Sequence, residues 1–315
     1  MLVRHSLSAG DFVASFNGAF SIAAAFSYLT IFVTRNFSEQ SRMIEKFRMF
    51  LKEENRIKDG THTAEKNGAE EIKFKNVSFT YPGNSSPTLK NINFSIKPKE
   101  KIALVGYNGA GKTTLTNLLL RLYDVTEGEI LIGGRNIKDE TVVSHRSRFA
   151  AVFQDFQIFA ATLGENVALD LNPDENEVKK ALRHSGFAKN LPQGTDTELL
   201  REFDDEGVML SGGEAQKIAV SRAFYKNCPY VIMDEPSANL DPVAEYNLNK
   251  AMTEAAENKT VVFISHRLST TRNADKIFVM ENGEIVESGS HEELMAQNGK
   301  YAYMFNLQAE KYRRE

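Results

Sequence analysis

Residues 106–113 read Gly-Tyr-Asn-Gly-Ala-Gly-Lys-Thr and match the phosphate-binding pattern G-x-x-x-x-G-K-[ST]. An apolar run, Ile102–Val105, leads into this stretch, and Leu115–Leu122 continues from it with helical spacing. A strand, a glycine-rich loop and a helix in this order let backbone N–H groups and the helix N-terminus face a phosphate. The alternative is a surface turn that contains a lysine, and the flanking strand and helix disfavour it. The sequence therefore predicts a P-loop that binds a nucleoside triphosphate.

Side chains on the loop and on a second strand predict where Mg²⁺ and the attacking water would sit. Lys112 can reach the β- and γ-phosphates, and the Thr113 hydroxyl can ligate Mg²⁺. The apolar run that starts at Tyr230 ends in Asp234 and Glu235, and as a central parallel strand it would end beside the P-loop. There Asp234 can hold Mg²⁺ through water, and Glu235 can polarise the water that attacks the γ-phosphate. The alternative is a strand that merely ends in two acidic residues, which the P-loop disfavours.

A second anion-binding stretch is predicted at Leu210–Gln216. Ser211, Gly212 and Gly213 precede a helical pattern, so exposed N–H groups are expected at a helix start. One nucleotide does not need two such sites in one chain. Two chains facing head to tail would each supply half of each site.

Together these motifs resemble the ATP-binding domain of an ABC transporter. The resemblance covers about residues 71 to 315, in the order of the family: Tyr81 in Phe79–Gly83, Gly106–Thr114 (Walker A), Gln154 in Val152–Asp155 (Q-loop), Leu210–Gln216 (signature), Val231–Glu235 (Walker B), Ser237–Asp241 (D-loop) and His266 in Ile264–Arg267 (H-loop).

The resemblance implies a role for each matching residue. Tyr81 would stack on adenine, Glu235 would be the general base, and His266 would contact the γ-phosphate. The implied catalytic residues are Glu235, His266 and Gln154. The implied ATP-binding residues are Tyr81, Gly106, Asn108, Gly109, Ala110, Gly111, Lys112, Thr113, Thr114 and Asp234. Those implied to meet the partner chain or its ATP are Ser211, Gly212, Gly213, Glu214 and Asp241. The implied ligands of the Mg²⁺ cofactor are Thr113, Gln154 and Asp234.

Composition limits the partners and the compartment. The 315 residues carry a formal net charge of −4 with well-mixed signs, and no basic block indicates a nucleic-acid partner. The single cysteine, Cys228, abuts the Asp234 strand and is expected to be a small buried residue. One cysteine permits no internal disulfide, as expected in the reducing cytosol.

The N-terminal segment is different in kind. No residue from Phe12 to Thr34 is charged, and as a helix of roughly 34 Å this run would cross a bilayer. A soluble core helix and an uncleaved signal peptide are the alternatives. One basic residue, Arg4, precedes the run, and six follow it: Arg35, Arg42, Lys46, Arg48, Lys52 and Arg56. The positive-inside rule then places the ATPase in the cytosol at the cell membrane.

The predicted fold is α/β. We expect a P-loop ATPase core with a mainly parallel sheet, a small antiparallel β subdomain and an α-helical lobe that carries the signature, preceded by one transmembrane and stalk helix. The expected domains are residues 1–51, the end of a membrane domain; 52–71, a polar linker; and 72–315, the ATP-binding domain. The parallel strands are expected at Ile102–Val105, Ala150–Phe153, Val231–Asp234, Val261–Ile264 and Ile277–Met280.

Two functions from different classes remain open. The first is the ATPase of a membrane exporter, paired with a second ATP-binding domain and a membrane domain. An exporter of this kind would carry about six membrane helices, so we expect this chain to be the C-terminal part of a half-transporter. The second is a soluble ABC-type ATPase acting on a protein or ribosome partner, which the Phe12–Thr34 run disfavours. An unrelated P-loop kinase or GTPase is excluded by the signature stretch.

Overall fold

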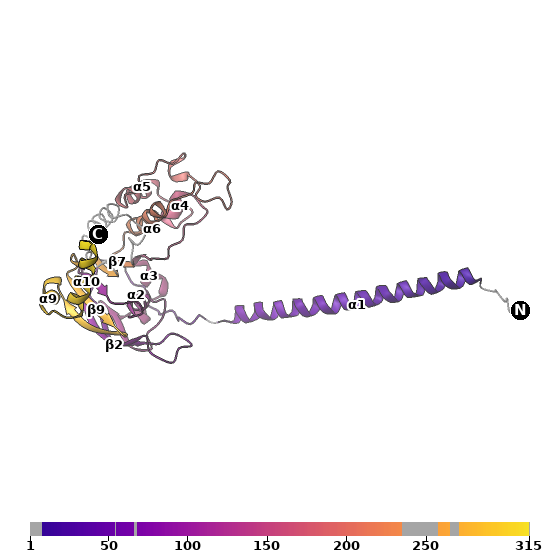
Figure 1. Ribbon diagram of the computed structural model, residues 1–315, viewed down its shortest axis with the longest axis horizontal. Coiled ribbons are helices and arrows are strands. Elements are labelled where there is room, and N and C mark those ends of the chain that lie inside the picture. Colours follow the sequence, from indigo (N-terminus) through magenta and orange to yellow (C-terminus); the bar gives the residue numbers. More distant parts are fainter. Residues whose placement is uncertain (1–7, 54, 66–67, 235–257, 265–270, 315) are drawn as a thin grey trace. The chain divides into compact units, whose positions relative to one another are not determined.

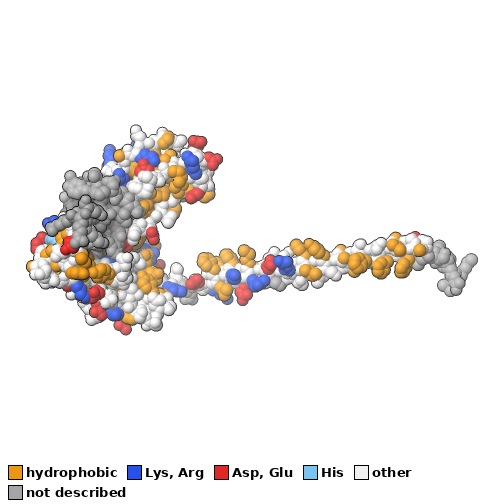
Figure 2. Space-filling view, in the orientation of Figure 1, with side chains coloured by type: hydrophobic (Ala, Val, Ile, Leu, Met, Phe, Trp, Pro, Cys, Tyr) orange, Lys and Arg blue, Asp and Glu red, His pale blue; other side chains and the backbone are white. Residues whose placement is uncertain are grey.

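The computed structural model describes residues 8–53, 55–65, 68–234, 258–264 and 271–314. Contacts divide the chain into two compact units, Met1–Arg56 and Ile57–Glu315. The first unit contains α1 (Ala9–Lys52), which begins at a capping box made by Ser8 and Asp11. Its large apolar side chains are exposed along its length (Figure 2). Among the described residues, α1 is the helix long and apolar enough to span a membrane.

The second unit begins with the antiparallel sheet that the sequence predicts. Strand β1 (Ile72–Phe79) pairs with β2 (Leu89–Ile96) and with β4 (Glu127–Ile132), and β5 (Arg135–Asn136) extends the sheet in the order β2-β1-β4-β5. The sequence did not predict β4 and β5. In β4 the consecutive residues Ile130, Leu131 and Ile132 are all buried, so its pattern does not alternate as a strand with one solvated face would.

The mainly parallel sheet is also confirmed, with one addition. Its strands are β3 (Lys101–Val105), β6 (Phe149–Val152), β7 (Tyr230–Asp234), β8 (Thr260–Ile264), β9 (Lys276–Glu281) and β10 (Glu284–Gly289), in the order β10-β9-β3-β8-β7-β6. All neighbours run parallel except β10, which pairs antiparallel with β9. Strand β7 is buried at every residue, as a central parallel strand should be. The carboxyl ends of β3 and β7 therefore face the same edge of the sheet.

The helices form separate groups around these sheets (Figure 1). Helix α2 (Lys112–Leu119) follows the P-loop, and η1 (Ile137–Asp139) and α3 (Val142–Ser147) lead into β6. The predicted helical lobe consists of α4 (Leu163–Ala168), α5 (Glu175–His184), η2 (Gly194–Asp196) and α6 (Gly212–Lys226), which share a core of their own. At the C-terminus, α9 (His291–Ala296) starts at a capping box made by Ser290 and Glu293, and α10 (Lys300–Arg314) follows it. Cys228 is buried, as expected.

Candidate nucleotide-binding site

The P-loop joins β3 to α2, and two of its glycines have no substitute. Gly106 has φ of 154°, and a Cβ there would lie 2.2 Å from the backbone oxygen of Met280 on β9. Gly111 is the N-cap of α2 with φ of 104°, and a Cβ there would lie 2.6 Å from Leu89. Both combine a left-handed backbone with a close neighbour, so only glycine fits. This backbone turns the loop around the N-terminus of α2, where the helix dipole favours an anion.

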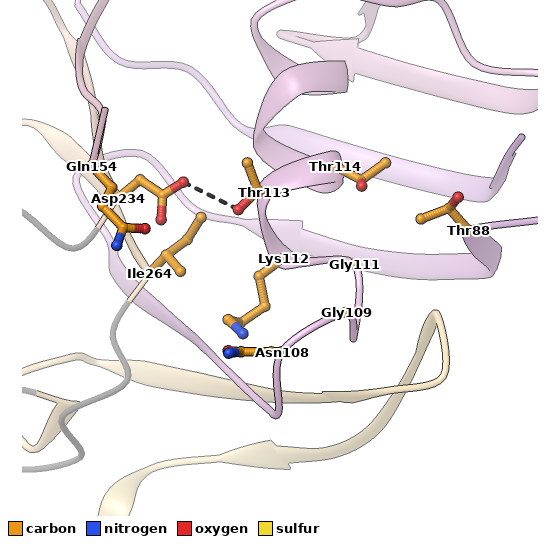
Figure 3. A pocket seen from close by; sticks show the side chains of 10 residues that line it. All are labelled: Thr88, Asn108, Gly109, Gly111, Lys112, Thr113, Thr114, Gln154, Asp234 and Ile264. Atoms are coloured by element: carbon orange, nitrogen blue, oxygen red, sulfur yellow. Dashed lines mark hydrogen bonds between the residues drawn. The ribbon is translucent and has the colours of Figure 1, made fainter. Parts of the chain in front are cut away.

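Beside this loop lies a pocket of about 420 Å³ (Figure 3). It is lined by Thr88, Asn108, Gly109, Gly111, Lys112, Thr113, Thr114, Gln154, Asp234 and Ile264. Eight of these ten were predicted as site residues from the sequence. Thr88 and Ile264 were not, because they reach the pocket only through the order of the strands: Thr88 precedes β2 and Ile264 is the last residue of β8.

Lys112 and Asp234 are both buried, at 6% exposure each. The Nζ of Lys112 donates to the carbonyl oxygens of Gly106 at 2.9 Å and Tyr107 at 3.1 Å. Burial lowers the pKa of Lys112, and the charge of Asp234 partly opposes this. Burial also raises the pKa of Asp234, against a hydrogen bond from Thr113 and the charge of Lys112. Burial of these two charged groups therefore raises the free energy of the empty pocket, and a bound ligand of suitable charge would lower it.

The three predicted Mg²⁺ ligands come together in the pocket. The Thr113 hydroxyl donates to Asp234 Oδ2 at 3.2 Å, and the exposed Gln154, just beyond β6, lines the same pocket. A hydroxyl, a carboxylate and an amide oxygen are the hard oxygen donors that Mg²⁺ prefers, and a single carboxylate suits an ion that is also held by phosphates. The residues present therefore fit Mg²⁺ bound together with a nucleotide.

Tyr81 is half-buried and is held from three directions. Its hydroxyl is 3.1 Å from Thr114 Oγ1. Its ring meets those of Phe79 and Tyr123 edge-on, with centroids 4.8 Å and 5.1 Å apart. These contacts fix Tyr81 against the first turn of α2, although it does not line the pocket itself. Tyr123 was not predicted, since an isolated tyrosine beyond a helix carries no signal in the sequence.

The signature residues lie at the start of α6 and do not line the pocket that contains Lys112. Ser211 is the N-cap, and its hydroxyl accepts from the Glu214 N–H at 3.3 Å, while Glu214 Oε2 accepts from the Ser211 N–H at 2.8 Å. Lys189 also donates to that carboxylate at 3.0 Å. The backbone hydrogen bond from Ser211 is the main reason why the pKa of Glu214 is lowered. The capping box holds the first N–H groups of α6 in place.

Three predicted site residues, Glu235, Asp241 and His266, lie outside the described residues. Their strands are described: β7 ends at Asp234 and β8 ends at Ile264, and both of these residues line the pocket.

Comparison with known proteins identifies the family. The ABC transporter family model matches residues 89–238. Residues 89–238 are an ABC transporter ATP-binding domain. The ATP-dependent lipid A-core flippase of Vibrio cholerae is 35% identical over 97% of this chain and 52% of its own length. A Staphylococcus aureus protein named for multidrug export is 42% identical over 76% of this chain and 43% of its own length.

A solved structure extends the match to three dimensions. The structure of a bacterial Atm1-family ABC exporter with ATP bound matches with a TM-score of 0.74 and 34% identity, over 85% of this chain and 46% of that one. The predicted fold class is thereby confirmed. The chain spans about half the length of these relatives, or somewhat less.

Proposed function

We propose that this chain binds and hydrolyses ATP and couples hydrolysis to export across a membrane. The observation that carries the proposal is that Lys112, Thr113, Gln154 and Asp234, from three separate stretches of sequence, line one pocket at the N-terminus of α2. The match to exporters of two named kinds supports the export step. The soluble alternative has no comparable support, because the match to the flippase covers 97% of the chain.

In the proposed mechanism, the N–H groups of the P-loop bind the β- and γ-phosphates. Lys112 exchanges its two carbonyl acceptors for phosphate oxygens, which relieves the cost of its burial. Thr113, Gln154 and Asp234 would hold Mg²⁺, which neutralises charge on the phosphates. Glu235 accepts the proton of the attacking water, and His266 holds the γ-phosphate in line. Tyr81 offers its ring face to adenine.

The proposed site is completed by a second chain. Gly212 and Gly213 present N–H groups at the start of α6, where Ser211 is the N-cap, and none of the three lines the Lys112 pocket. In a head-to-tail pair, Ser211, Gly213 and Glu214 of each chain would close over the ATP of the other, and Asp241 would lie at the interface. A single two-fold axis generates both sites.

The proposed location is the cell membrane, with the ATPase domain on the cytoplasmic side. Helix α1 has the length and the apolar composition of a membrane span, and the basic residues follow its uncharged run. ATP is available on that side, so the two arguments agree.

Nucleotide titration and phosphate release on the full chain in detergent test this proposal. Lys112→Ala should lose ATP binding, whereas the matched change at an exposed lysine, Lys97→Ala, should not. Glu235→Gln should bind ATP but hydrolyse it about 10²–10⁴-fold more slowly. Near-normal affinity of Lys112→Ala for ATP would contradict the assignment of the P-loop. Unchanged turnover in Glu235→Gln would mean that another residue is the general base.

A further inference from the structure

The polar segment that follows the membrane helix lies on the ATPase unit from Lys58 onward. We call residues 58–64 the strap. Its backbone runs beside η1 and the turn after it, with His62 bridging to Glu140 in parallel. The Gly60 N–H donates to Glu140 O at 3.1 Å, His62 N–H donates to Asp139 O at 2.9 Å, and Thr141 N–H donates to His62 O at 2.8 Å. The strap is thus paired with its neighbour as a short strand would be.

Two further bonds fasten the strap to the start of α3. Asp59 Oδ1 accepts from the Val142 N–H at 2.7 Å, and the Ala64 N–H donates to Ser144 Oγ at 3.0 Å. The Val142 N–H is one of those that a helix start leaves without a partner of its own, so Asp59 satisfies it. Ala64 is buried.

Gly60 sits where no side chain fits. A Cβ at this position would lie 2.2 Å from both the carbonyl carbon and the oxygen of Asp139. That distance is far below any real contact, and the atoms concerned are backbone and cannot move aside alone. Gly60 is therefore the position at which one methyl group would lift the strap.

Arg121 ties the strap to the P-loop helix. It follows the end of α2 and is 1% exposed. One guanidinium nitrogen donates to Lys58 O at 2.6 Å, another donates to Glu140 O at 2.6 Å, and Nε pairs with Asp124 at 3.2 Å. A buried guanidinium needs such partners. The strap supplies one of them, so lifting it would leave this buried charge short of an acceptor.

A second attachment reaches the Asp234 strand. The Glu70 N–H donates to Tyr230 Oη at 2.8 Å, and the Glu70 carboxylate lies 3.6 Å from Arg148. Tyr230 is 1% exposed and is the first residue of β7, whose last residue is Asp234. The segment between the membrane helix and the domain is therefore attached to both elements whose opposite ends form the nucleotide pocket.

We propose that the strap is a coupling element, which passes nucleotide-dependent changes at the pocket to the segment that leads to the membrane helix. Arg121 fixes the strap to the end of α2, and Glu70, farther along the same segment, attaches it to β7. The inference rests on the proposed function. A flexible chain covering residues 52–71 would span about 25 Å, whereas the residues before Lys58 alone span about 13 Å. Attachment of the strap thus shortens the span of the flexible connection by roughly half, so that less of such a movement would be lost in it.

Hydrogen exchange of the full chain in detergent tests the proposal. The Gly60 and His62 amides should exchange at least about 100-fold more slowly than in an unstructured peptide, and Mg²⁺ with ATP should slow them further. In Gly60→Ala these amides should approach peptide rates and lose their response to ATP, while the P-loop amides are still protected by it. The matched control is the exposed neighbour, Thr61→Ala, which should behave as the wild type.

Asp59 offers a milder pair of variants. Asp59→Ala removes the acceptor for Val142 and should speed exchange in the strap, whereas Asp59→Asn retains an acceptor oxygen and should not. Peptide-like exchange of the strap in the wild type would overturn the proposal, as would ATP that protects the P-loop but leaves the strap unchanged. If ATP protects neither, the proposed function itself fails.

Discussion

Replacing Asp234 by asparagine should stabilise the empty protein and weaken its response to nucleotide. Asp234 is 6% exposed, and its burial raises its pKa although Thr113 and Lys112 oppose the shift. A raised pKa means that the folded state binds the proton more tightly than the unfolded chain does. The contribution of Asp234 to stability is therefore complete below the unfolded pKa of 3.8 and is lost as pH rises through the folded value.

At pH 7 the buried carboxyl group is therefore less favourable in the folded protein than in the unfolded chain, and the isosteric amide removes this free-energy cost. Removing such a cost at a functional site typically gains about 0.5–2 kcal/mol, and each 1 kcal/mol raises the midpoint by about 2–4 °C in a domain of this size. Wild type at 100 times its Kd for Mg²⁺-ATP gains about 2.7 kcal/mol. If the variant binds about 100-fold more weakly, it gains about 0.4 kcal/mol at the same concentration.

The order of stability should therefore reverse between the two conditions. Thermal unfolding in detergent at pH 7, with and without Mg²⁺-ATP, measures both. Without ligand Asp234→Asn should melt above the wild type, and with ligand it should melt below. The exposed change Asp205→Asn should alter neither midpoint. A lower midpoint for the empty Asp234→Asn protein would refute the conclusion that burial dominates at this carboxylate.

Two further substitutions test separate parts of the account. Glu140 is 2% exposed; burial alone would raise its pKa, but His145 and Arg148 together outweigh that and lower it. Glu140→Gln should cost up to about 3–5 kcal/mol because it leaves buried Arg148 with the half-exposed Glu70, 3.6 Å away, as its remaining carboxylate partner. In urea titrations this cost should shrink as pH falls through the lowered pKa of Glu140; a pH-independent cost would contradict the assignment. Ser211→Ala should lower stability by only about 1 kcal/mol, the value of an N-cap, yet abolish phosphate release if the hydroxyl binds the partner's ATP; activity that falls only in step with stability would limit Ser211 to capping.

Pocket residues could be predicted from the sequence wherever function requires a particular residue type at a fixed spacing. The P-loop and Asp234 were predicted in this way, and Gln154 from the resemblance to the ABC family; they meet because parallel strands end at the same edge of the sheet. Thr88 and Ile264 could not be found, since no chemistry marks them and only strand order brings them to the pocket. The same applies to Tyr123, which acts by packing against Tyr81.

Other elements of the structure could not be predicted from the sequence for different reasons. The strap is polar and contains a glycine, which predicts a linker. In five of the six hydrogen bonds described above, however, the strap contributes a main-chain group, and such bonds leave no pattern of side chains in the sequence. Strand β10, which follows a turn at Asn282 and Gly283, was missed because its apolar residues Ile285 and Val286 are adjacent and do not alternate with polar ones. The buried Arg121 was missed because an arginine is expected at the surface unless its partners are known.

The central claim is that two chains share each ATP, and mixing two inactive variants tests it most directly. Lys112→Ala removes the P-loop lysine, and Ser211→Arg blocks the signature at the start of α6. Each variant alone should release no phosphate. Mixed dimers, formed by co-expression and purified with two different tags, retain one site with both halves intact, so phosphate release should return. No recovery in purified mixed dimers, together with a specific activity of the wild type that stays constant on dilution, would mean that one chain hydrolyses ATP alone and would contradict the account.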